Sequence, residues 1–394
     1  MKKVCMVAYT YYHWDARIPK EAEALVQQGI RVDCLCLREG DYASFSVING
    51  VNVYCLPLGK FRGSSTIKYM LSYIFFFFLT FFTVSKFHFK RRYDVVQFHT
   101  LPDFIIFAGL IPKIFGAKLV LDMHEITPEF YMLKFGVSES HLLIRILKLL
   151  EKICASFADA VIVVDDPIKR LLLQRCKFKS EPTVIMNSPD ERLFCSDGFT
   201  RIESFNSFSL IYHGTLTSLY GLEFAVQAVA KLKDRIPHLR FYIFGNETDA
   251  SNLKELAEEL DVCSNVIFMG RVPREEIPRY LYQADIGVLP TIRGEFTDLT
   301  FSNKLAEYVC MKRPVVATRL KSALEYFPED AISYFESQNV DELASKVFEL
   351  CIDPQKRLIQ AENAFRYYQK IKWEIMKKRY IDLIDSLIGG DYSA

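Results

Sequence analysis

The chain has 394 residues, of which 50% are hydrophobic and 25% charged, and its formal net charge is +1. That length allows two domains of ordinary size, each with its own core. The balanced charge excludes a surface that gathers nucleic acid. The 10 cysteines include no C-x-x-C pair, and several fall inside apolar runs. This cysteine usage predicts reduced thiols in a cytoplasmic protein.

The first half of the chain alternates short β-rich runs with amphipathic stretches, the pattern of parallel α/β architecture. Strands are predicted at 3–9, 31–37, 51–57, 94–99, 118–124, 160–166 and 183–187, and helices at 18–28 and 142–157 among others. The polar, uneven segment 188–208 is predicted to connect two domains.

The second half starts the same alternation again. Its predicted strands are 209–214, 240–245, 265–270, 286–290, 314–318 and 331–335. Several end in glycine or proline, where ligand-facing loops begin at the carboxyl edge of an open parallel sheet. We therefore predict an α/β protein of two facing Rossmann-like domains, residues 1–190 and 205–371, with a cleft between them.

The segment 295–317 carries the most informative side chains. Ser302 or Asn303 can cap a helix that starts near Lys304, which places Lys304 and Glu307 on one face of its first turns. A positive helix end with a lysine suits a diphosphate, and the glutamate suits the vicinal diol of a ribose. A surface ion pair between Lys304 and Glu307 is the alternative interpretation.

This segment resembles the donor-binding signature of retaining GT-B glycosyltransferases of family 4. The likeness is greatest to a bacterial surface-polysaccharide branch with the pattern (T/S)-N-K-L-x-E-Y-M-x-x-G-x-P-V-V-A. The block 93–131 with its D-x-H-(D/E), the N-x-P-D at 187–190 and YHGTL at 212–216 follow in family order. The resemblance covers nearly the whole chain. It implies a GT-B fold whose C-terminal helix, within 372–394, returns to the N-terminal domain.

The resemblance also implies an activity. A hexosyl or N-acetylhexosaminyl group would move from a nucleotide-diphosphate donor, of the UDP-sugar kind, with retention onto a glycan acceptor. In this branch the acceptor is lipid-linked and the product is a surface polysaccharide. Two alternatives stay open. One is a non-hydrolysing nucleotide-sugar epimerase, which also has two facing Rossmann-like domains, and the other is a non-catalytic GT-B partner subunit.

Site residues follow from the resemblance by position. Three are catalytic: Glu307 holds the donor ribose, Lys304 the diphosphate, and His124 faces the donor sugar across the cleft. The further donor-binding positions are Gly214, Thr215, Gly245, Arg271, Val272, Arg293, Ser302 and Asn303. The positions assigned to the acceptor side are His13, Asp15, Arg17, His99 and Glu125.

Two of these assignments have a structural alternative, since Asp15 can cap the first helix and His99 can be a hydrogen-bonded loop residue. No D-x-D motif occurs in the sequence, and no His, Cys and Asp cluster has metal-ligand spacing. We therefore expect no metal or other cofactor, with the nucleotide sugar as a substrate.

Three positions depart from the family pattern. The first acid of its E-x7-E pair falls on Leu299, with Asp298 one residue away and Glu295 four. The loop GTLTSLYG (214–221) lacks the usual Arg and Lys, so Lys304 must neutralise more of the diphosphate charge. Lys312 stands where the family has a helix-ending glycine.

The stretch YIFFFFLTFF (73–82) is the most apolar part of the chain. A membrane span is excluded, because the strands before and after this stretch belong to one predicted sheet. One interpretation is a helix buried on both sides. The other is a helix with one face on the sheet and one on an anionic membrane, peripheral at the cytoplasmic face of the cell membrane. The predicted membrane contacts are Phe75, Phe76, Phe77, Phe78, Phe81, Phe82, Lys90, Arg91 and Arg92, with His88 counted among the surface cations.

Overall fold

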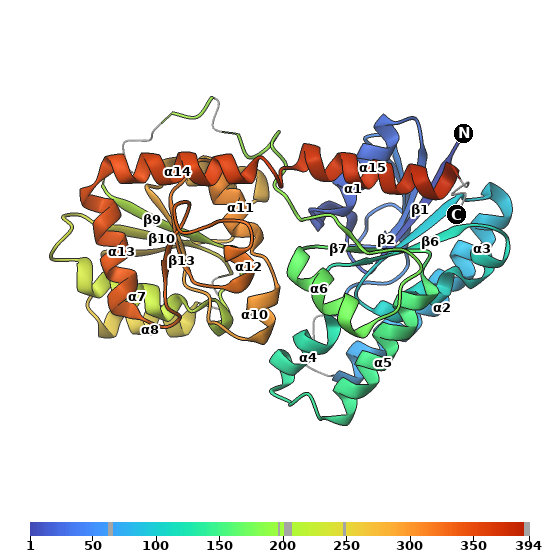
Figure 1. Ribbon diagram of the computed structural model, residues 1–394, viewed down its shortest axis with the longest axis horizontal. Helices are drawn as coiled ribbons and strands as arrows, with labels where there is room; N and C mark the ends of the chain where they lie inside the picture. The colour runs from blue at the N-terminus through green and yellow to red at the C-terminus, as the bar shows by residue number, and fades with distance from the viewer. Residues whose placement is uncertain (62–65, 196–197, 201–206, 247–249, 390–394) are drawn as a thin grey trace. The chain divides into compact units, whose positions relative to one another are not determined.

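A computed structural model describes residues 1–61, 66–195, 198–200, 207–246 and 250–389 (Figure 1). The chain divides into two compact units, one formed by Met1–Asn187 with the chain from Glu374 onward, the other by Ser188–Trp373. The C-terminal unit starts at Ser188, before the predicted start at 205, so the predicted connection is counted with this unit. Of the predicted connection 188–208, residues 196–197 and 201–206 lie outside the described residues.

The N-terminal unit is built on an eight-stranded sheet of order β3-β4-β2-β1-β5-β6-β7-β8. Its strands are β1 Lys3–Ala8, β2 Arg31–Leu37, β3 Phe45–Ile48, β4 Val51–Leu56, β5 Val95–His99, β6 Lys118–Met123, β7 Ala160–Val163 and β8 Thr183–Val184. Its helices are α1 Ile18–Gln27, α2 Thr66–Arg91, α3 Leu110–Ile114, α4 Thr127–Phe135, α5 Leu142–Phe157, α6 Asp166–Arg175 and α15 Trp373–Gly389, with short 3₁₀ helices η1 Tyr12–Trp14 and η2 Asp103–Gly109. Every strand pair is parallel except β3–β4.

Helix α2 contains the phenylalanine run. It has 26 residues without glycine or proline, so nothing in its sequence interrupts the helix. By length and composition, Lys68–Arg91 could cross a membrane. However, α2 connects β4 to β5, and both strands belong to the same parallel sheet. A helix that joins two strands of one sheet cannot place them on opposite sides of a bilayer, so α2 is a crossover helix.

The C-terminal unit has a six-stranded parallel sheet of order β11-β10-β9-β12-β13-β14. Its strands are β9 Ser209–His213, β10 Arg240–Phe244, β11 Val266–Gly270, β12 Ile286–Leu289, β13 Val315–Thr318 and β14 Ser333–Phe335. Its helices are α7 Leu222–Leu232, α8 Ser251–Glu259, α9 Ile277–Gln283, α10 Glu295–Leu299, α11 Asn303–Cys310, α12 Lys321–Leu324, α13 Val340–Ile352 and α14 Pro354–Tyr368, with 3₁₀ helices η4 Ser218–Tyr220 and η6 Arg274–Glu276. In chain order the sheet reads 3-2-1-4-5-6, and the direction of winding changes between β9 and β12.

The chain end returns to the N-terminal unit as the resemblance implied. Helix α15 packs there through Tyr380, whose hydroxyl donates to Gln97 Oε1 at 2.6 Å, and through Lys377, which donates to Gln27. One strand, β3, is absent from the prediction. It forms an antiparallel hairpin with β4 through Asn49 and Gly50, which both have positive φ. The two Rossmann-like sheets otherwise confirm the predicted fold class.

Candidate active site

Three glycine-bearing loops meet at the carboxyl edge of the C-terminal sheet. The Gly214 N–H donates to Phe244 O, and the Gly245 N–H donates to Gly270 O. A Cβ atom on Gly245 would lie 2.6 Å from Gly214 O. Gly214 itself has a φ of +121°, a backbone conformation that residues with a Cβ atom rarely adopt. The loops after β9, β10 and β11 therefore pack backbone against backbone, next to the point where the sheet reverses its winding.

Lys304 is held beside this backbone. A Cβ on Gly214 would lie 2.4 Å from Lys304 Cε, so only glycine leaves room for the lysine. The Nζ atom lies 4.0 Å from the ring centroid of Tyr220 and 5.6 Å from that of Tyr212. Burial lowers the pKa of Lys304 to about 8, although Glu307 opposes this shift. A desolvated ammonium group against exposed loop backbone is suited to bind an anion.

Glu307 lies one turn further along α11, and its carboxylate is almost buried. Its Oε1 lies 3.4 Å from Arg274 Nη2, and its Oε2 lies 3.3 Å from His213 Nε2 outside hydrogen-bond geometry. Burial, Lys304 and Arg274 together lower the pKa of His213 to about 3, so the imidazole is neutral. Lys304 and Arg274 are the cations near the neutral His213, and Glu307 is the one carboxylate beside it. The site therefore carries excess positive charge.

Most of the other predicted donor residues lie at the start of α11 or in the loops that follow β9 and β11. Ser302 and Asn303 do open α11, although the Ser302 side chain makes no cap hydrogen bond. Thr215 is exposed beside Gly214, and its carbonyl accepts from Tyr212 at 2.7 Å. Arg271 and Val272 follow directly after β11.

Arg293 has an acidic partner within the unit. Its Nε forms an ion pair with Asp298 at 3.1 Å, and its side chain is 40% exposed. Asp298 also accepts from the Lys321 N–H, so its carboxylate stabilises the contact between α10 and α12. The missing acid at Leu299 is therefore not replaced by its neighbour Asp298.

Arg274 and Tyr220 are site residues that the sequence analysis did not identify. Arg274 lies three residues beyond the predicted Arg271, in η6, and reaches Glu307. Tyr220 stands in the loop that lacks the family's Arg and Lys, and its ring faces Lys304. An aromatic residue directly before Gly221 was the available signal, since aromatic faces attract ammonium groups.

The N-terminal unit holds a second polar cluster, at the carboxyl ends of β5 and β6. His99 Nδ1 lies 3.1 Å from His124 Nε2 and 3.1 Å from Asp122 Oδ2. Arg17 binds both oxygens of Asp122, at 2.9 and 3.0 Å. Arg17 also contacts Glu21 at 2.9 Å. Asp122 is the first residue of the D-x-H-(D/E) motif, but its pairing with Arg17, 105 residues away, gives no signal in the sequence. Glu21, four residues after Arg17, was not predicted.

The charges of this cluster follow from burial and from Arg17. Burial would raise the pKa of Asp122, but Arg17 and His124 hold it well below its usual range. Burial would lower the pKa of His124, and Asp122 outweighs that effect and raises it. Burial also lowers the pKa of His99 despite Asp122. The result is a histidine pair with His124 as the readily protonated member.

Two of the acceptor-side residues are buried. Arg17 is only 5% exposed, and its guanidinium is fully used by Asp122, Glu21, Ile185 O and Asn187. His99 is 2% exposed beneath His124. Both residues therefore hold Asp122 in place within the cluster.

The remaining acceptor-side residues differ in their surroundings. Asp15 accepts from the backbone N–H of Arg17 and of Ile18, which is the helix-capping alternative. This bonding leaves its second carboxylate oxygen available to a ligand. His13 is exposed, with its ring 5.3 Å from that of Tyr42. Glu125 is half-buried, and burial raises its pKa.

His99, Asp122 and His124 also have ligand atoms within 4.8 Å of one another, the one such group with metal-binding potential among the described residues. Sequence spacing gives no sign of this group, because its members stand at the ends of two different strands. The Arg17 guanidinium nevertheless binds both Asp122 oxygens, and a cation in that position opposes a second one. These donors fit proton sharing better than a divalent metal.

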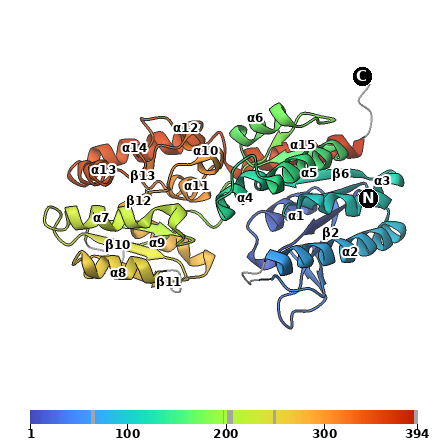
Figure 2. The same cartoon turned by 90° about the horizontal axis from the view of Figure 1, so that it is seen from below.

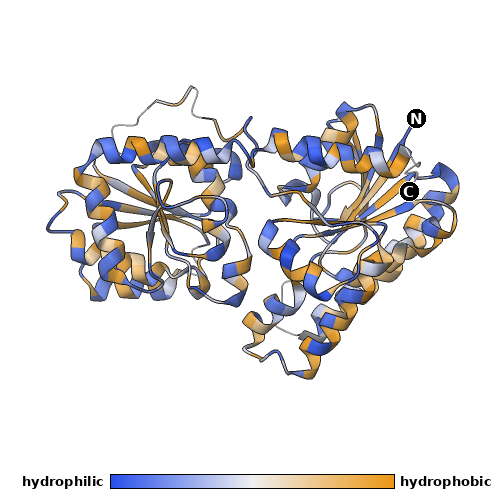
Figure 3. Cartoon of the chain, viewed as in Figure 1, coloured by the Kyte–Doolittle hydropathy of each residue, from blue (hydrophilic) through white to orange (hydrophobic). Residues whose placement is uncertain are grey.

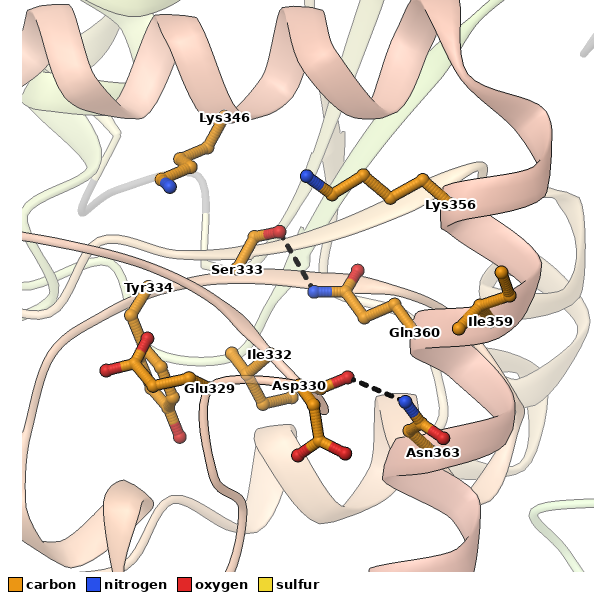
Figure 4. A pocket seen from close by; sticks show the side chains of 10 residues that line it. All are labelled: Glu329, Asp330, Ile332, Ser333, Tyr334, Lys346, Lys356, Ile359, Gln360 and Asn363. Atoms are coloured by element: carbon orange, nitrogen blue, oxygen red, sulfur yellow. Dashed lines mark hydrogen bonds between the residues drawn. The ribbon is translucent and has the colours of Figure 1, made fainter.

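One pocket of the C-terminal unit, of about 300 Å³, lies away from these loops. Figure 4 shows Gln360 donating to Ser333 and Asn363 donating to the backbone carbonyl of Asp330 across it. Ser333 is the first residue of β14, so this pocket opens at the amino edge of the parallel sheet. Ligands of such sheets bind at the carboxyl edge, and the pocket is not the candidate site.

Two Rossmann-like units, with a cationic strand-end site in one of them, place the protein in the α/β class with the GT-B fold. The model of "Glycosyl transferase 4-like domain" matches residues 16–187, and that of "Glycosyl transferases group 1" matches residues 207–353. The chain belongs to the GT-B glycosyltransferases of family 4. These matches favour the glycosyltransferase interpretation over the epimerase alternative, which the fold alone did not exclude.

Known proteins with partial similarity include D-inositol 3-phosphate glycosyltransferase of Corynebacterium urealyticum, 28% identical over 44% of this chain and 42% of that protein. The chain therefore matches less than half the length of this relative. Chitobiosyldiphosphodolichol β-mannosyltransferase of Debaryomyces hansenii is 22% identical over 72% of this chain and 66% of that protein. Among solved structures, Anabaena HepE in complex with UDP-glucose has a TM-score of 0.72 at 16% identity, covering 98% and 100% of the two chains.

Proposed function

We propose that the protein transfers a hexosyl or N-acetylhexosaminyl group from a UDP-sugar to a lipid-linked glycan, with retention, during surface polysaccharide assembly. The observation that carries the donor assignment is the half-buried Lys304 beside Gly214, one turn before Glu307. Its ammonium group lies against exposed loop backbone at the start of α11, where a diphosphate gains from both the lysine and the helix end.

Each donor group has a counterpart in this site. The diphosphate would be neutralised by Lys304, with Arg274 as the second nearby cation. The Glu307 carboxylate would accept hydrogen bonds from the ribose hydroxyls. The nucleotide type rests on a structural neighbour, since HepE was solved with UDP-glucose. No step of this proposal uses a metal, because the lysine and the helix end supply the positive charge that the leaving group needs.

His124 is the residue of the N-terminal unit that we propose as hydrogen-bond donor to the transferred sugar. Asp122 favours its protonated form and also fixes the ring. Retention by double displacement would require a carboxylate close to the anomeric carbon, and Glu125 is the nearest candidate in sequence. We instead propose a same-face reaction assisted by the leaving group, with Glu125 orienting the acceptor. The proposed lipid-linked acceptor is supported by the name of one relative, chitobiosyldiphosphodolichol β-mannosyltransferase.

A thermal-shift screen against a panel of UDP-, GDP- and other nucleotide sugars tests the donor assignment, because a ligand of the native state raises the melting temperature. Calorimetric titration of the ligand found would follow for Lys304→Ala and Glu307→Ala. We expect both variants to lose at least about tenfold in affinity, the equivalent of one lost charged contact. Lys231→Ala and Glu255→Ala, exposed residues of α7 and α8, serve as matched controls. Undiminished binding by both site variants would refute the assignment.

A further inference from the structure

Helix α2 presents an apolar face to solvent. Its buried side is formed by Tyr73, Phe76, Thr80, Val84 and His88, spaced three or four residues apart. The opposite side exposes Phe75, Phe78 and Phe82, each more than half exposed. Only 22% of its most apolar 18-residue window is buried. A core helix of a soluble protein is buried over most of such a window, whereas one side of α2 is left uncovered by the described part of the chain.

These positions correct two of the predicted membrane contacts, Phe76 and Arg91, and the predicted exposure of His88. Phe76 is fully buried, with its ring 5.1 Å from that of Tyr9. Arg91 Nη1 forms an ion pair with the buried Asp33, and its Nη2 donates to Tyr54. His88 is buried, and burial lowers its pKa, so the side chain is neutral. None of the three can meet a headgroup.

A second helix, α5, has the same property. Its buried side includes Ile144, Glu151, Cys154 and Ala155. The other side exposes Leu142, Ile146, Leu149 and Ile153, between 46% and 68% each. Their spacing of four, three and four residues places them on a single face of the helix. The amphipathic pattern of residues 142–157 predicted a helix, and the structure shows exposed apolar side chains on the side opposite its buried one.

The two helices belong to one surface. Short helix η2 packs between them, with Phe104 5.9 Å from Phe77 of α2 and Phe107 5.1 Å from Phe157 of α5. Helix α3 adds exposed Leu110, Ile114 and Phe115, and the Phe115 ring is 5.0 Å from that of Phe89. Figure 2 shows α2 and α5 on one side of the N-terminal unit. Figure 3 shows the orange, hydrophobic positions along both helices. We name the exposed faces of α2, α3 and α5 the α2–α5 face.

Exposed charges on α2 and α5 are all positive. They are Lys68, Lys86 and Lys90 on α2 and Arg145 and Lys152 on α5, with Arg92 directly after α2. Helix α2 contains no acid. The one acid of α5, Glu151, is buried in an ion pair with Arg175. The nearby exposed Glu139 pairs with Lys148 of α5. An apolar face with basic margins matches the interface of a membrane that carries anionic lipids.

We propose that the α2–α5 face is a two-helix docking surface for an anionic bilayer, with both helices lying in the plane of the interface. A symmetric dimer through this face would bring the basic margins of two copies together, which opposes that occupant. This inference rests on the proposed function in one respect, because docking would bring the enzyme to a lipid-linked acceptor. Membrane binding itself is independent of donor binding.

Flotation of the full chain with vesicles of phosphatidylcholine, alone or with a quarter phosphatidylglycerol, tests the proposal. The α2 variant replaces Phe75, Phe78 and Phe82 by serine, and the α5 variant replaces Ile146, Leu149 and Ile153 by serine. All six side chains are solvent-exposed, so both variants should fold. Each should lose about tenfold or more in binding to the anionic vesicles, given the area that each removes. Replacing exposed Leu358 and Ile359 of α14 by serine is the control and should change nothing.

Three results would overturn the inference. An α5 variant that binds as the wild type would leave α2 as the sole contact. Equal binding of the wild type to both vesicle types would remove the role of the basic margin. A dimer that persists in the presence of vesicles, and that the same substitutions dissociate, would make the face a self-association surface. Donor affinity measured on every variant keeps these outcomes distinct from failure of the proposed function.

Discussion

Replacing Lys304 by methionine should make the ligand-free protein more stable and prevent nucleotide binding. The methionine keeps most of the side-chain volume beside Gly214 but removes a charge that is held largely out of water. Function and stability therefore conflict at this position. A lysine that served only a structural role would show the opposite effect, since its loss would lower stability.

The size of the gain follows from the pKa of Lys304. Lowering that pKa from its usual 10.5 to about 8 costs about 3 kcal/mol, at about 1.4 kcal/mol for each pH unit. The attraction between the ammonium and the ring of Tyr220 returns about 1–2 kcal/mol of this in a desolvated site. The variant should gain about 1–2 kcal/mol, or about 2–8 °C in the melting temperature of a unit of this size.

The gain should also depend on pH in one direction. The folded protein releases the Lys304 proton near pH 8, whereas the unfolded chain keeps it to about 10.5. Between these values the unfolded state binds more protons, so the stability of the wild type rises with pH. The advantage of the variant is complete at pH 7 and shrinks above about pH 8.

Scanning calorimetry at pH 7, 8, 9 and 9.5, with and without UDP, measures both effects. UDP should raise the melting temperature of the wild type and leave that of Lys304→Met unchanged. Lys231→Met, which alters an exposed lysine in the same unit, should match the wild type throughout. A variant no more stable than the wild type at pH 7, or stabilised equally by UDP, would refute the reasoning.

Three further predictions concern other groups. Burial and then Glu151 raise the pKa of Asp103 to about 7, so its contribution to stability is lost as pH rises from about 4 through 7. Asp103→Asn should therefore melt above the wild type at pH 8 and not at pH 4, and equal shifts at both would contradict this. Asp122→Asn should lower the pKa of His124 in an NMR titration of the imidazole, and an unchanged pKa would show that Asp122 is not its cause. Gly214→Ala should displace Lys304 and weaken UDP binding by about tenfold or more, the effect of one charged contact. Gly29→Ala, where a Cβ meets nothing within 4 Å, should bind UDP normally, and equal affinities for both variants would refute the contact.

The sheets could be predicted because their strands are buried on both faces and therefore form continuous apolar runs. Strand β3 has no such run, since its residues alternate between exposed and half-buried at the sheet edge. Its signal was the Asn49-Gly50 pair, which supports the positive φ values of a tight hairpin. Edge strands are identified by their turns more readily than by their own residues.

The candidate site was predictable where its residues are close in sequence. Lys304 and Glu307 lie three apart, so helical geometry alone places them together. Arg17 and Asp122 are 105 residues apart, and only the pairing of β1, β5 and β6 brings them into contact. Similarly, the exposed side of α5 is defined by what packs on its other side, which periodicity does not specify. Spacing predicts neighbours within an element, and the fold decides neighbours between elements.

Transfer of sugar from the nucleotide is the central claim, and its most direct measurement uses a labelled donor. The purified chain would be incubated with the UDP-sugar found in the screen, labelled in the sugar, and with vesicles made from bacterial lipid extract. The account predicts equal amounts of released UDP and of label in the lipid fraction, with both lost in Glu307→Ala. A labelled nucleotide sugar that is bound yet stays intact, or that changes only its sugar configuration without any acceptor, would contradict it.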